Sequence, residues 1–403
     1  MLNQWCWERC NIDFNITSTL KRLQIEGDFI TMSQPLKVID WTVTEDNQNP
    51  HKTDWHVATL NRTFSAALYH LSTSYDDLAL KFRIKYVLRV IQAIYYPILA
   101  IFGLAVNIVT IVILSQGKCG LSRWITCYLV AMSVADLFVI ILDLMLRHIP
   151  IVFKRQFIFL RSVPLCNIHA VLLHAAIDCS VWFTVAFTFD RFVLLCCRKL
   201  KCKYCTERTA SVILVSMTVL SGLKNIFWYF MFSGLYRLQK EPWFCYTSPG
   251  VQLSLVWGSI EFVHYILTPV IPFVLILLLN ALTAKHILMK SKVRKRLHTQ
   301  SNVRNVRDAE MENRRRSIIL LFLISANFIL LWSTLLISTL WQRMFLLGYD
   351  VWLNRYWRDI GFMLQLLSCC TNTCIYVVTQ KLFRKHLKNI LLYLFTLKVQ
   401  AIQ

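Results

Sequence analysis

The segment between Cys166 and Arg191 constrains the fold more than any other part of the chain. The two residues lie 25 positions apart, and almost every residue between them is apolar or small. As an α-helix rising about 1.5 Å per residue, the segment is roughly 37 Å long, enough to cross a hydrocarbon core of about 30 Å. A thiol then lies at one mouth of the membrane and the Asp190–Arg191 pair at the other, where charged groups can reach the headgroup layer. The segment therefore predicts a transmembrane helix.

Seven apolar runs in all are long enough to span a bilayer. The chain is 56% hydrophobic and 16% charged, whereas soluble domains carry about 25% charged residues. The sequence therefore predicts an all-α membrane protein, a seven-transmembrane helix bundle in a lipid membrane. From hydropathy alone, we place the spans at residues 88–114, 126–147, 165–196, 210–232, 252–284, 316–342 and 357–379.

The charge of the chain is basic and unevenly distributed. The net charge is +22, yet residues 1–85 hold nine Lys/Arg against ten Asp/Glu. The excess lies in loops at 118–123, 198–208, 290–316 and 381–388, and the positive-inside rule makes these loops cytoplasmic. We therefore expect a multi-pass plasma-membrane protein with its N-terminus outside, although a basic stretch at 81–89 stands against this orientation. Once the spans are removed, no soluble nucleic-acid module remains, so nucleic acid is excluded as a partner.

Residues 1–87 are expected to be an extracellular N-terminal segment without regular structure. They show no sustained helical or strand period, and they lack the continuous apolar stretch of a signal peptide. Asn15-Ile-Thr and Asn61-Arg-Thr match the glycosylation acceptor triplet. Each triplet is either an acceptor or a chance match, and the predicted outside location favours an acceptor.

Short motifs spread over residues 90–390 resemble those of rhodopsin-like (class A) G-protein-coupled receptors, in the same order and at the same spacing. They are Gly103-Leu-Ala-Val-Asn107, Ser133-Val-Ala-Asp136, Cys166 with Ser180 and Phe189-Asp190-Arg191, Pro272-Phe273 with Asn280, Phe328 with Trp332, Asn372-Thr-Cys-Ile-Tyr376, and Phe383-Arg384 at the start of an amphipathic eighth helix. Two phrases, at 115–122 and 223–229, resemble a small orphan branch with members that respond to aromatic amino acids or short peptides.

The resemblance implies a receptor that binds a small extracellular ligand, a short peptide or an aromatic amino acid, and that activates heterotrimeric G proteins. Residues 88–380 would form the receptor domain, and 381–403 the amphipathic helix with a short cytoplasmic tail. The family's G-protein coupling and activation residues correspond here to Asp190, Arg191, Asn280, Phe328, Trp332, Asn372 and Tyr376. No cofactor is expected, apart from a sodium ion near Asp136.

The chain departs from the family pattern in four places. Thr334 and Thr373 replace the prolines of the sixth and seventh helices, so both helices should kink less because the backbone N–H is retained. Arg314 stands at the inner end of the sixth helix, where some relatives carry a glutamate. No salt bridge from there to Arg191 is expected, and resting activity should be higher. Residues 220–224 occupy the place of the fourth-helix tryptophan.

Polar residues recur at helical spacing inside the spans. A carboxylate such as that of Asp136 is costly within an apolar span and usually marks function. Steps of seven and four residues form two polar stripes, Asp136 with Asp143 and Arg147, and Arg358 with Gln365 and Asn372. The predicted ion or water cluster comprises Asn107, Asp136, Ser180 and Asn372, and the predicted ligand pocket above it comprises Asp143, Arg147, Leu173, His174, Ile177, Glu261, His264, Trp332, Arg358 and Gln365. The alternative is that these polar groups only join helices.

Arg147 and Arg358 top the two stripes, and we expect them at the pocket mouth, where a guanidinium suits a carboxylate. The first outer loop is basic over residues 154–161 and would attract an anion. We therefore predict a ligand with a free carboxylate and an aromatic or apolar body. The alternative is that Asp143 neutralises Arg147 and Asp359 neutralises Arg358, which leaves nothing for a ligand.

Other classes of function fit less well. Leu173 stands two turns above Ser180, where amine receptors need a carboxylate, and Leu366 stands where a retinal Schiff base needs a lysine. No G-x-x-x-x-G-K-[ST], G-x-S-x-G or H-E-x-x-H motif occurs, so no enzyme activity is expected. The alternative class is a transporter or channel, which inverted repeats or paired broken helices would support. The sequence shows neither.

Two long-range pairs can be predicted from position. Cys166 and Cys245 both lie on the predicted outer side, where disulfides persist, so we predict a disulfide between them. Asp178 and Lys224 lie at similar heights in the third and fourth spans, where an unpaired charge is costly. We predict a buried ion pair, and the alternative is that Lys224 reaches outward while Asp178 bonds His264.

Overall fold

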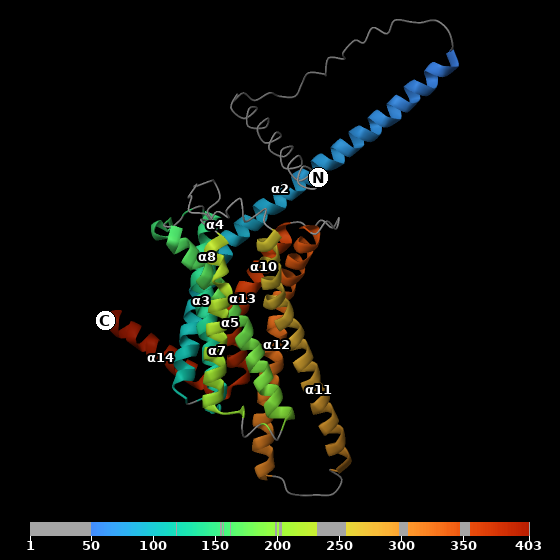
Figure 1. The fold of residues 1–403 in the computed structure, drawn as a ribbon. Helices are drawn as coiled ribbons and strands as arrows, with labels where there is room; N and C mark the ends of the chain where they lie inside the picture. The colour runs from blue at the N-terminus through green and yellow to red at the C-terminus, as the bar shows by residue number, and fades with distance from the viewer. Residues whose placement is uncertain are drawn as a thin grey trace. The chain divides into compact units, whose positions relative to one another are not determined.

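In the computed structural model, every regular element of the described residues is a helix (Figure 1). The structure describes residues 50–117, 119–153, 155, 157–161, 163–197, 200, 204–231, 255–297, 305–346 and 355–402. The chain divides into two units, Met1–Thr73 and Ser74–Gln403. The second unit holds all the apolar helices, and the packing described below lies within it.

The helices of this unit follow one another along the chain. They are α2 (Pro50–Ser115), whose first turns belong to the other unit, α3 (Arg123–Val139), η1 (Ile140–His148), α4 (Ile149–Phe153), η2 (Ile158–Arg161), α5 (Val163–Cys196), α7 (Glu207–Asn225), α8 (Phe227–Met231), α10 (Leu255–Tyr265), η3 (Ile266–Val270), α11 (Ile271–Leu297), α12 (Asn305–Leu346), α13 (Arg355–Thr379) and α14 (Lys381–Ile402). The segments η1 and η3 are π-helical, a form that is often found at functional sites.

Seven helical stretches in the described residues are long and apolar enough to cross a membrane. They are Phe82–Ser115, Arg123–Phe153, Pro164–Cys196, Glu207–Phe230, Val256–Lys290, Arg315–Gln342 and Tyr356–Thr379. The predicted number of spans is confirmed, and their boundaries agree to within a few residues. Hydropathy succeeds here because a spanning helix must be apolar over nearly its whole length.

The expectation for the N-terminal segment is wrong over the part that the structure describes. No regular structure was expected before residue 88, yet α2 begins at Pro50 and runs for 66 residues without a break. An α-helix satisfies its backbone hydrogen bonds within itself, so it can continue beyond a span without a strong apolar period. Asn61 therefore lies within a helix, while Asn15 lies outside the described residues.

The fifth span is interrupted, whereas the sixth and seventh spans are continuous helices. The fifth span contains Pro269 and a non-helical residue, Thr268, with φ −149° and ψ 109°. In contrast, α12 and α13 are single α-helices of 42 and 25 residues that contain Thr334 and Thr373 where relatives have proline. The retained backbone N–H groups are consistent with this continuity, and the smaller kink stays a prediction.

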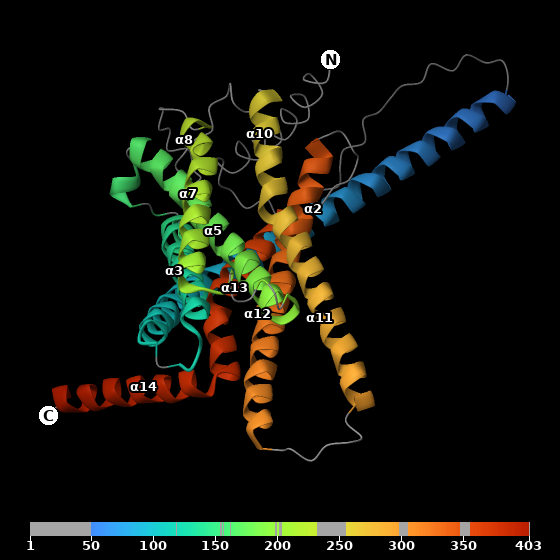
Figure 2. The ribbon, with the colours of Figure 1, turned by 60° about the horizontal axis from the view of Figure 1, so that its bottom comes forward.

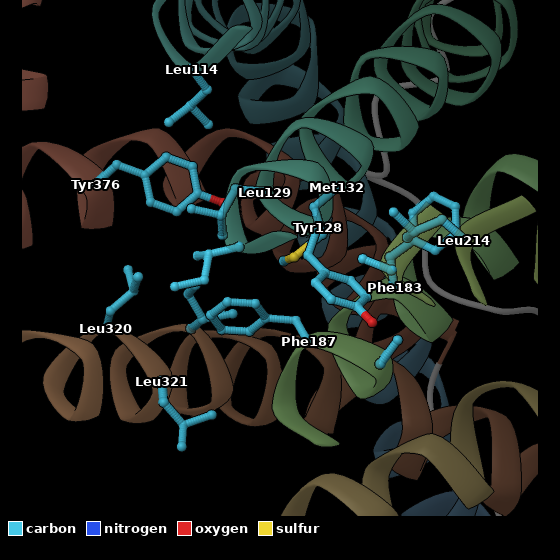
Figure 3. Close-up of a cluster of buried hydrophobic side chains, with 14 of the residues drawn as sticks. Leu114, Tyr128, Leu129, Met132, Phe183, Phe187, Leu214, Leu320, Leu321 and Tyr376 are labelled. Carbon is cyan, nitrogen blue, oxygen red and sulfur yellow. The ribbon is translucent and has the colours of Figure 1, made fainter. Parts of the chain in front are cut away.

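The helices meet in a large apolar cluster (Figure 3). The cluster joins residues from most of the spans, among them Leu114, Tyr128, Leu129, Met132, Phe183, Phe187, Leu214, Leu320, Leu321 and Tyr376. In addition, α12 and α13 approach closely at Gly361, where an added Cβ would lie 2.8 Å from the Cα of Leu335. This glycine allows the two helices to pack backbone to backbone.

After α13 the chain turns sharply into α14, which runs across the spanning helices rather than along them (Figure 2). The side chain of Phe383 is fully buried, with its ring centroid 6.0 Å from that of Tyr376. The Nη1 atom of Arg384 donates to the carbonyls of Val377 and Val378, both at 2.8 Å. These contacts close the end of α13 and fix the start of α14.

Candidate functional site

A buried carboxylate lies at the centre of the bundle. Asp136 on α3 is 1% exposed, its Oδ1 accepts from Ser180 Oγ at 2.6 Å, and its Oδ2 accepts from Asn372 Nδ2 at 2.8 Å. It borders a polar cavity lined by Asp136, Ser180, Thr184, Ile324, Asn327, Phe328, Trp332, Ser368 and Asn372. The structure thus brings together three of the four residues predicted for the ion or water cluster. The fourth, Asn107, instead donates to the carbonyls of Gly103 and Cys369, at 2.9 and 3.0 Å.

The aromatic pair of α12 forms one wall of this cavity. The rings of Phe328 and Trp332 are stacked, with centroids 5.3 Å apart, and Trp332 Nε1 donates to Ser368 Oγ at 3.1 Å. One turn inward, Thr371 Oγ1 donates to Asn327 Oδ1 at 2.8 Å. Sequence reasoning missed these polar partners on α13 and α12. Ser368 could have been found, because it lies one helical turn before Asn372.

Near the end of α5, Arg191 is fully buried. Its Nη2 donates to Asp190 Oδ2 at 2.6 Å, its Nη1 donates to Ser317 Oγ at 3.3 Å, and its guanidinium lies 5.3 Å from the Phe187 ring centroid. The contact from Arg191 to α12 is therefore made to a neutral hydroxyl. The expectation that no salt bridge joins Arg191 to the position of Arg314 stays a prediction, because the side chain of Arg314 lies outside the described residues.

Three other groups complete the inner end. Asn280 Nδ2 donates to the Ile276 carbonyl at 2.8 Å, and Tyr376 is 1% exposed beside α14. Tyr204, in the loop after α5, lies edge-on to Phe189 at 5.7 Å. Burial, followed by the nearby carboxylate of Asp190, raises the pKa of Tyr204, so its phenol stays neutral at physiological pH.

The outer part of the bundle holds a second buried carboxylate, on the π-helical segment η1. Asp143 is fully buried, its Oδ1 accepts from Arg147 Nη1 at 3.1 Å, and His148 Nε2 lies 3.4 Å away. The Arg147 guanidinium lies 5.2 Å from the ring centroid of Phe362 on α13. The pairing of Arg147 with Asp143, which was one of the two predicted alternatives, is thus present.

The remaining predicted pocket residues on α13 and α5 lie close to this pair in the fold. Arg358 Nη1 donates to Gln342 Oε1 on α12 at 3.1 Å. Gln365 is 1% exposed, and its Oε1 has no hydrogen-bond partner within the part of the chain that the structure describes. Leu173 is buried. Ile177 packs against two apolar clusters, one that contains Leu366 and one that contains Trp332.

His174 and His264 belong to an aromatic group between α5, α8 and α10. The ring of His174 stacks on Trp228 with centroids 4.0 Å apart, and His264 meets the same Trp228 ring edge-on at 5.4 Å. The Nδ1 atom of His174 lies 2.8 Å from the Ala170 carbonyl oxygen. Glu261 is half-buried on α10, one turn before His264.

The predicted ion pair between the third and fourth spans is confirmed. Lys224 Nζ lies 2.6 Å from Asp178 Oδ2, and the same oxygen accepts from Asn225 Nδ2 at 2.5 Å. The alternative bond from Asp178 to His264 is not the one that forms. Asp178 is 1% exposed, whereas the Lys224 side chain is partly exposed, at 23%.

Covalent and metal features are sparser. Cys166 is disulfide-bonded, but its predicted partner Cys245 lies outside the described residues, so that pairing stays a prediction. Across the described ranges, no three His, Cys, Asp or Glu side chains gather as the ligands of a metal ion would.

A comparison with protein families agrees with this arrangement. The model of the 7 transmembrane receptor (rhodopsin family) matches residues 106–376, which is more than half of the chain. The match includes the cavity around Asp136, the aromatic pair of α12 and the buried Arg191. The chain therefore belongs to the rhodopsin-like, class A family of G-protein-coupled receptors, multi-pass membrane proteins that signal through heterotrimeric G proteins.

Proposed function

We propose that this receptor binds a small extracellular ligand with a free carboxylate and an aromatic or apolar body, either an aromatic amino acid or a short peptide. The observation that carries the proposal is the position of Arg147. Its guanidinium lies over Phe362, and Phe362 packs against the apolar cluster that contains Phe328 and Trp332. A ligand with its carboxylate at Arg147 and its apolar body at Phe362 would therefore reach the aromatic pair of α12.

The ion pair with Asp143 does not prevent this binding. A guanidinium carries five N–H donors, and the hydrogen bond to Asp143 is made from Nη1. In the proposed complex the ligand carboxylate shares this guanidinium with the groups that already contact it, and Asp143 holds Arg147 in place rather than removing it. Arg358, on the outer turn of α13, is the second arginine that we propose for the carboxylate, with Gln365 further inward.

An agonist series tests the proposal. Aromatic amino acids and short peptides are applied with the carboxylate free or amidated, and G-protein activation is measured on the parent, Arg147→Ala and Arg358→Ala. We expect amidation and Arg147→Ala each to lower agonist potency by about tenfold or more, because a charge-assisted bidentate contact is lost. Arg123→Ala, a fully exposed residue at the start of α3, is the matched control. Equal potency of free and amidated agonists on all of these proteins would contradict the carboxylate model.

We also propose that the cavity beside Asp136 holds a sodium ion in the resting receptor. Among the described residues, Asp136 has no ion pair, whereas Asp143, Asp178 and Asp190 each have one. The cavity offers carboxylate, hydroxyl and amide oxygens, which suit a hard cation. Asp136, Ser180 and Ser368 would hold the ion, with amide oxygens nearby, and it would supply the positive charge that Asp136 lacks.

The orientation and the remaining site roles belong to the same proposal. We place the N-terminus outside, with Asn15 and Asn61 as glycosylation acceptors. An epitope at the N-terminus should be labelled on intact cells, and glycosidase treatment should increase the electrophoretic mobility of the receptor. The G-protein contact and the activation switch are assigned to Asp190, Arg191, Asn280, Phe328, Trp332, Asn372 and Tyr376.

A further inference from the structure

A polar cluster to which the proposed ligand site assigns no role joins three spans. Lys224 on α7 bridges two elements, with its Nζ 2.6 Å from Asp178 Oδ2 on α5 and donating to Thr268 Oγ1 on η3 at 3.0 Å. Asn225, the last residue of α7, donates to the same Asp178 oxygen. The ammonium of Lys224 is thus shared between the third and fifth spans.

The acceptor of this bond lies where the fifth span is not helical. Thr268 has φ −149° and ψ 109°, between the helical turns of α10 and α11. Thr268 is buried, at 4% exposed. Its hydroxyl oxygen also accepts from Trp182 Nε1 on α5, at 3.3 Å. Two donors from two different helices therefore hold the side chain at this break.

Helix α7 and segment η3 both pack on α5, and their other main neighbours differ. The contacts of α7 are with α3, α5 and α8, while those of η3 are with α5, α10 and α11. The side chain of Lys224 therefore links two elements that mainly meet through α5. Because α11 continues directly from η3 to the cytoplasmic side, a restraint at Thr268 is a restraint on α11.

The cluster is also connected to the cavity and to Arg191. Trp182 packs against the apolar cluster that contains Phe328 and Trp332. Helix α11 contacts both α5 and α12. Arg191 is fully buried and donates to Ser317 on α12. A cytoplasmic protein can reach Arg191 only if the inner ends of these helices separate.

We propose that Asp178, Lys224 and Thr268 form an interhelical clamp that holds the break in the fifth span against α5 and α7 in the resting receptor, and that loss of the clamp raises ligand-independent G-protein activation. The charge pair supplies the strength, since the buried Asp178 carboxylate holds the Lys224 ammonium at 2.6 Å. The bond to Thr268 transmits the restraint to the fifth span. Because the readout needs no ligand, the clamp can fail or hold independently of the proposed ligand class.

Two variants release the clamp in different ways. Thr268→Val removes the acceptor hydroxyl while it keeps the ion pair and nearly the same shape. Asp178→Asn/Lys224→Met removes both charges together, so no unpaired charge is left buried. The matched control is Thr218→Val on α7, whose hydroxyl donates to the Leu214 carbonyl of the same helix at 2.9 Å.

The measurement is basal signalling per receptor at the cell surface, with reporters for the main G-protein classes, together with hydrogen–deuterium exchange of residues 255–285 in purified receptor. In both clamp variants we expect basal signalling to rise about fivefold, the factor that corresponds to one hydrogen bond of typical net strength. Exchange in the fifth span should rise in the same two variants, and Thr218→Val should match the parent in both readouts. Parental signalling and parental exchange in both clamp variants, at normal surface level, would overturn the proposal.

Discussion

Asp136 and Asp178 are both 1% exposed carboxylates inside the bundle, yet their surroundings differ in one respect. Asp178 has a cation from the protein itself, Lys224, at 2.6 Å. Asp136 is held by the neutral donors Ser180 and Asn372 and borders a cavity. A carboxylate that has its own cation joins helices permanently, whereas one without a cation leaves a charge that an ion from solution can balance.

The difference also separates two kinds of role. A closed ion pair, as we call Asp178 with Lys224, contributes to structure and changes only when the helices that carry it move apart. The open site is the Asp136 carboxylate with its cavity. An open carboxylate responds to the ion concentration and to any change in the walls of its cavity, one of which contains Phe328 and Trp332. We therefore expect the Asp178 site to set the resting arrangement of the spans, and the Asp136 site to make that arrangement sensitive to sodium.

The largest expected effect comes from opening the closed pair on one side only. Lys224→Met leaves the Asp178 carboxylate buried without its cation, which costs about 3–5 kcal/mol of folding free energy in comparable pairs. We expect a clear loss of thermal stability and of surface expression. Asp178→Asn/Lys224→Met should recover most of this loss, and thermal unfolding of all the variants gives the coupling energy. Additive effects of the two substitutions would show that the pair is not coupled.

A smaller effect is expected at the open site when its wall is changed. Asn327 lines the cavity and accepts from Thr371 at 2.8 Å, which ties α12 to α13. Asn327→Leu removes this bond, worth about 1 kcal/mol, so basal signalling should increase because α12 is held less firmly. Ser333→Ala is the control, since that hydroxyl bonds within α12, to the Leu330 carbonyl. Unchanged basal signalling in Asn327→Leu would remove this bond from the resting restraints.

The smallest effect is expected when the Asp178 site is made to resemble the Asp136 site. Lys224→Ala leaves Asp178 without a cation and vacates the space of the Lys224 side chain. The weakened variant should then gain stability from sodium, by about 0.4 kcal/mol when the sodium concentration equals its dissociation constant. Thermal unfolding in sodium and in N-methylglucamine buffers measures the difference. If the two buffers give the same unfolding temperature, the presence of a protein cation is not what distinguishes the two sites.

The sequence predicts the fold well but only part of the sites. The seven spans follow from hydropathy because each window is strongly apolar, and the Asp178–Lys224 pair follows from the heights of two charges in neighbouring helices. The bond from Lys224 to Thr268 does not follow, because it depends on the non-helical backbone at Thr268, which an ordinary helical period does not reveal. The helix from Pro50 was also missed, since a helix beyond the membrane needs no apolar stripe.

The bond between Asn327 and Thr371 illustrates a further limit. Both residues are polar and lie within spans, but their pairing depends on how α12 and α13 are rotated against each other. The close approach of Gly361 to the Leu335 backbone sets that rotation, and it is a tertiary feature. Spacing along one helix gives the face on which a residue lies, but not the partner on the next helix.

A sodium titration of thermal stability in purified receptor tests the contrast between the two carboxylates most directly. The parent should be stabilised saturably by sodium, by about 1.4 kcal/mol when sodium is about tenfold above its dissociation constant, and not by N-methylglucamine. Asp136→Asn should lose this response, while Asp178→Asn/Lys224→Met should keep it. A parent that sodium does not stabilise, or an Asp136→Asn variant that responds like the parent, would contradict the assignment of the open site.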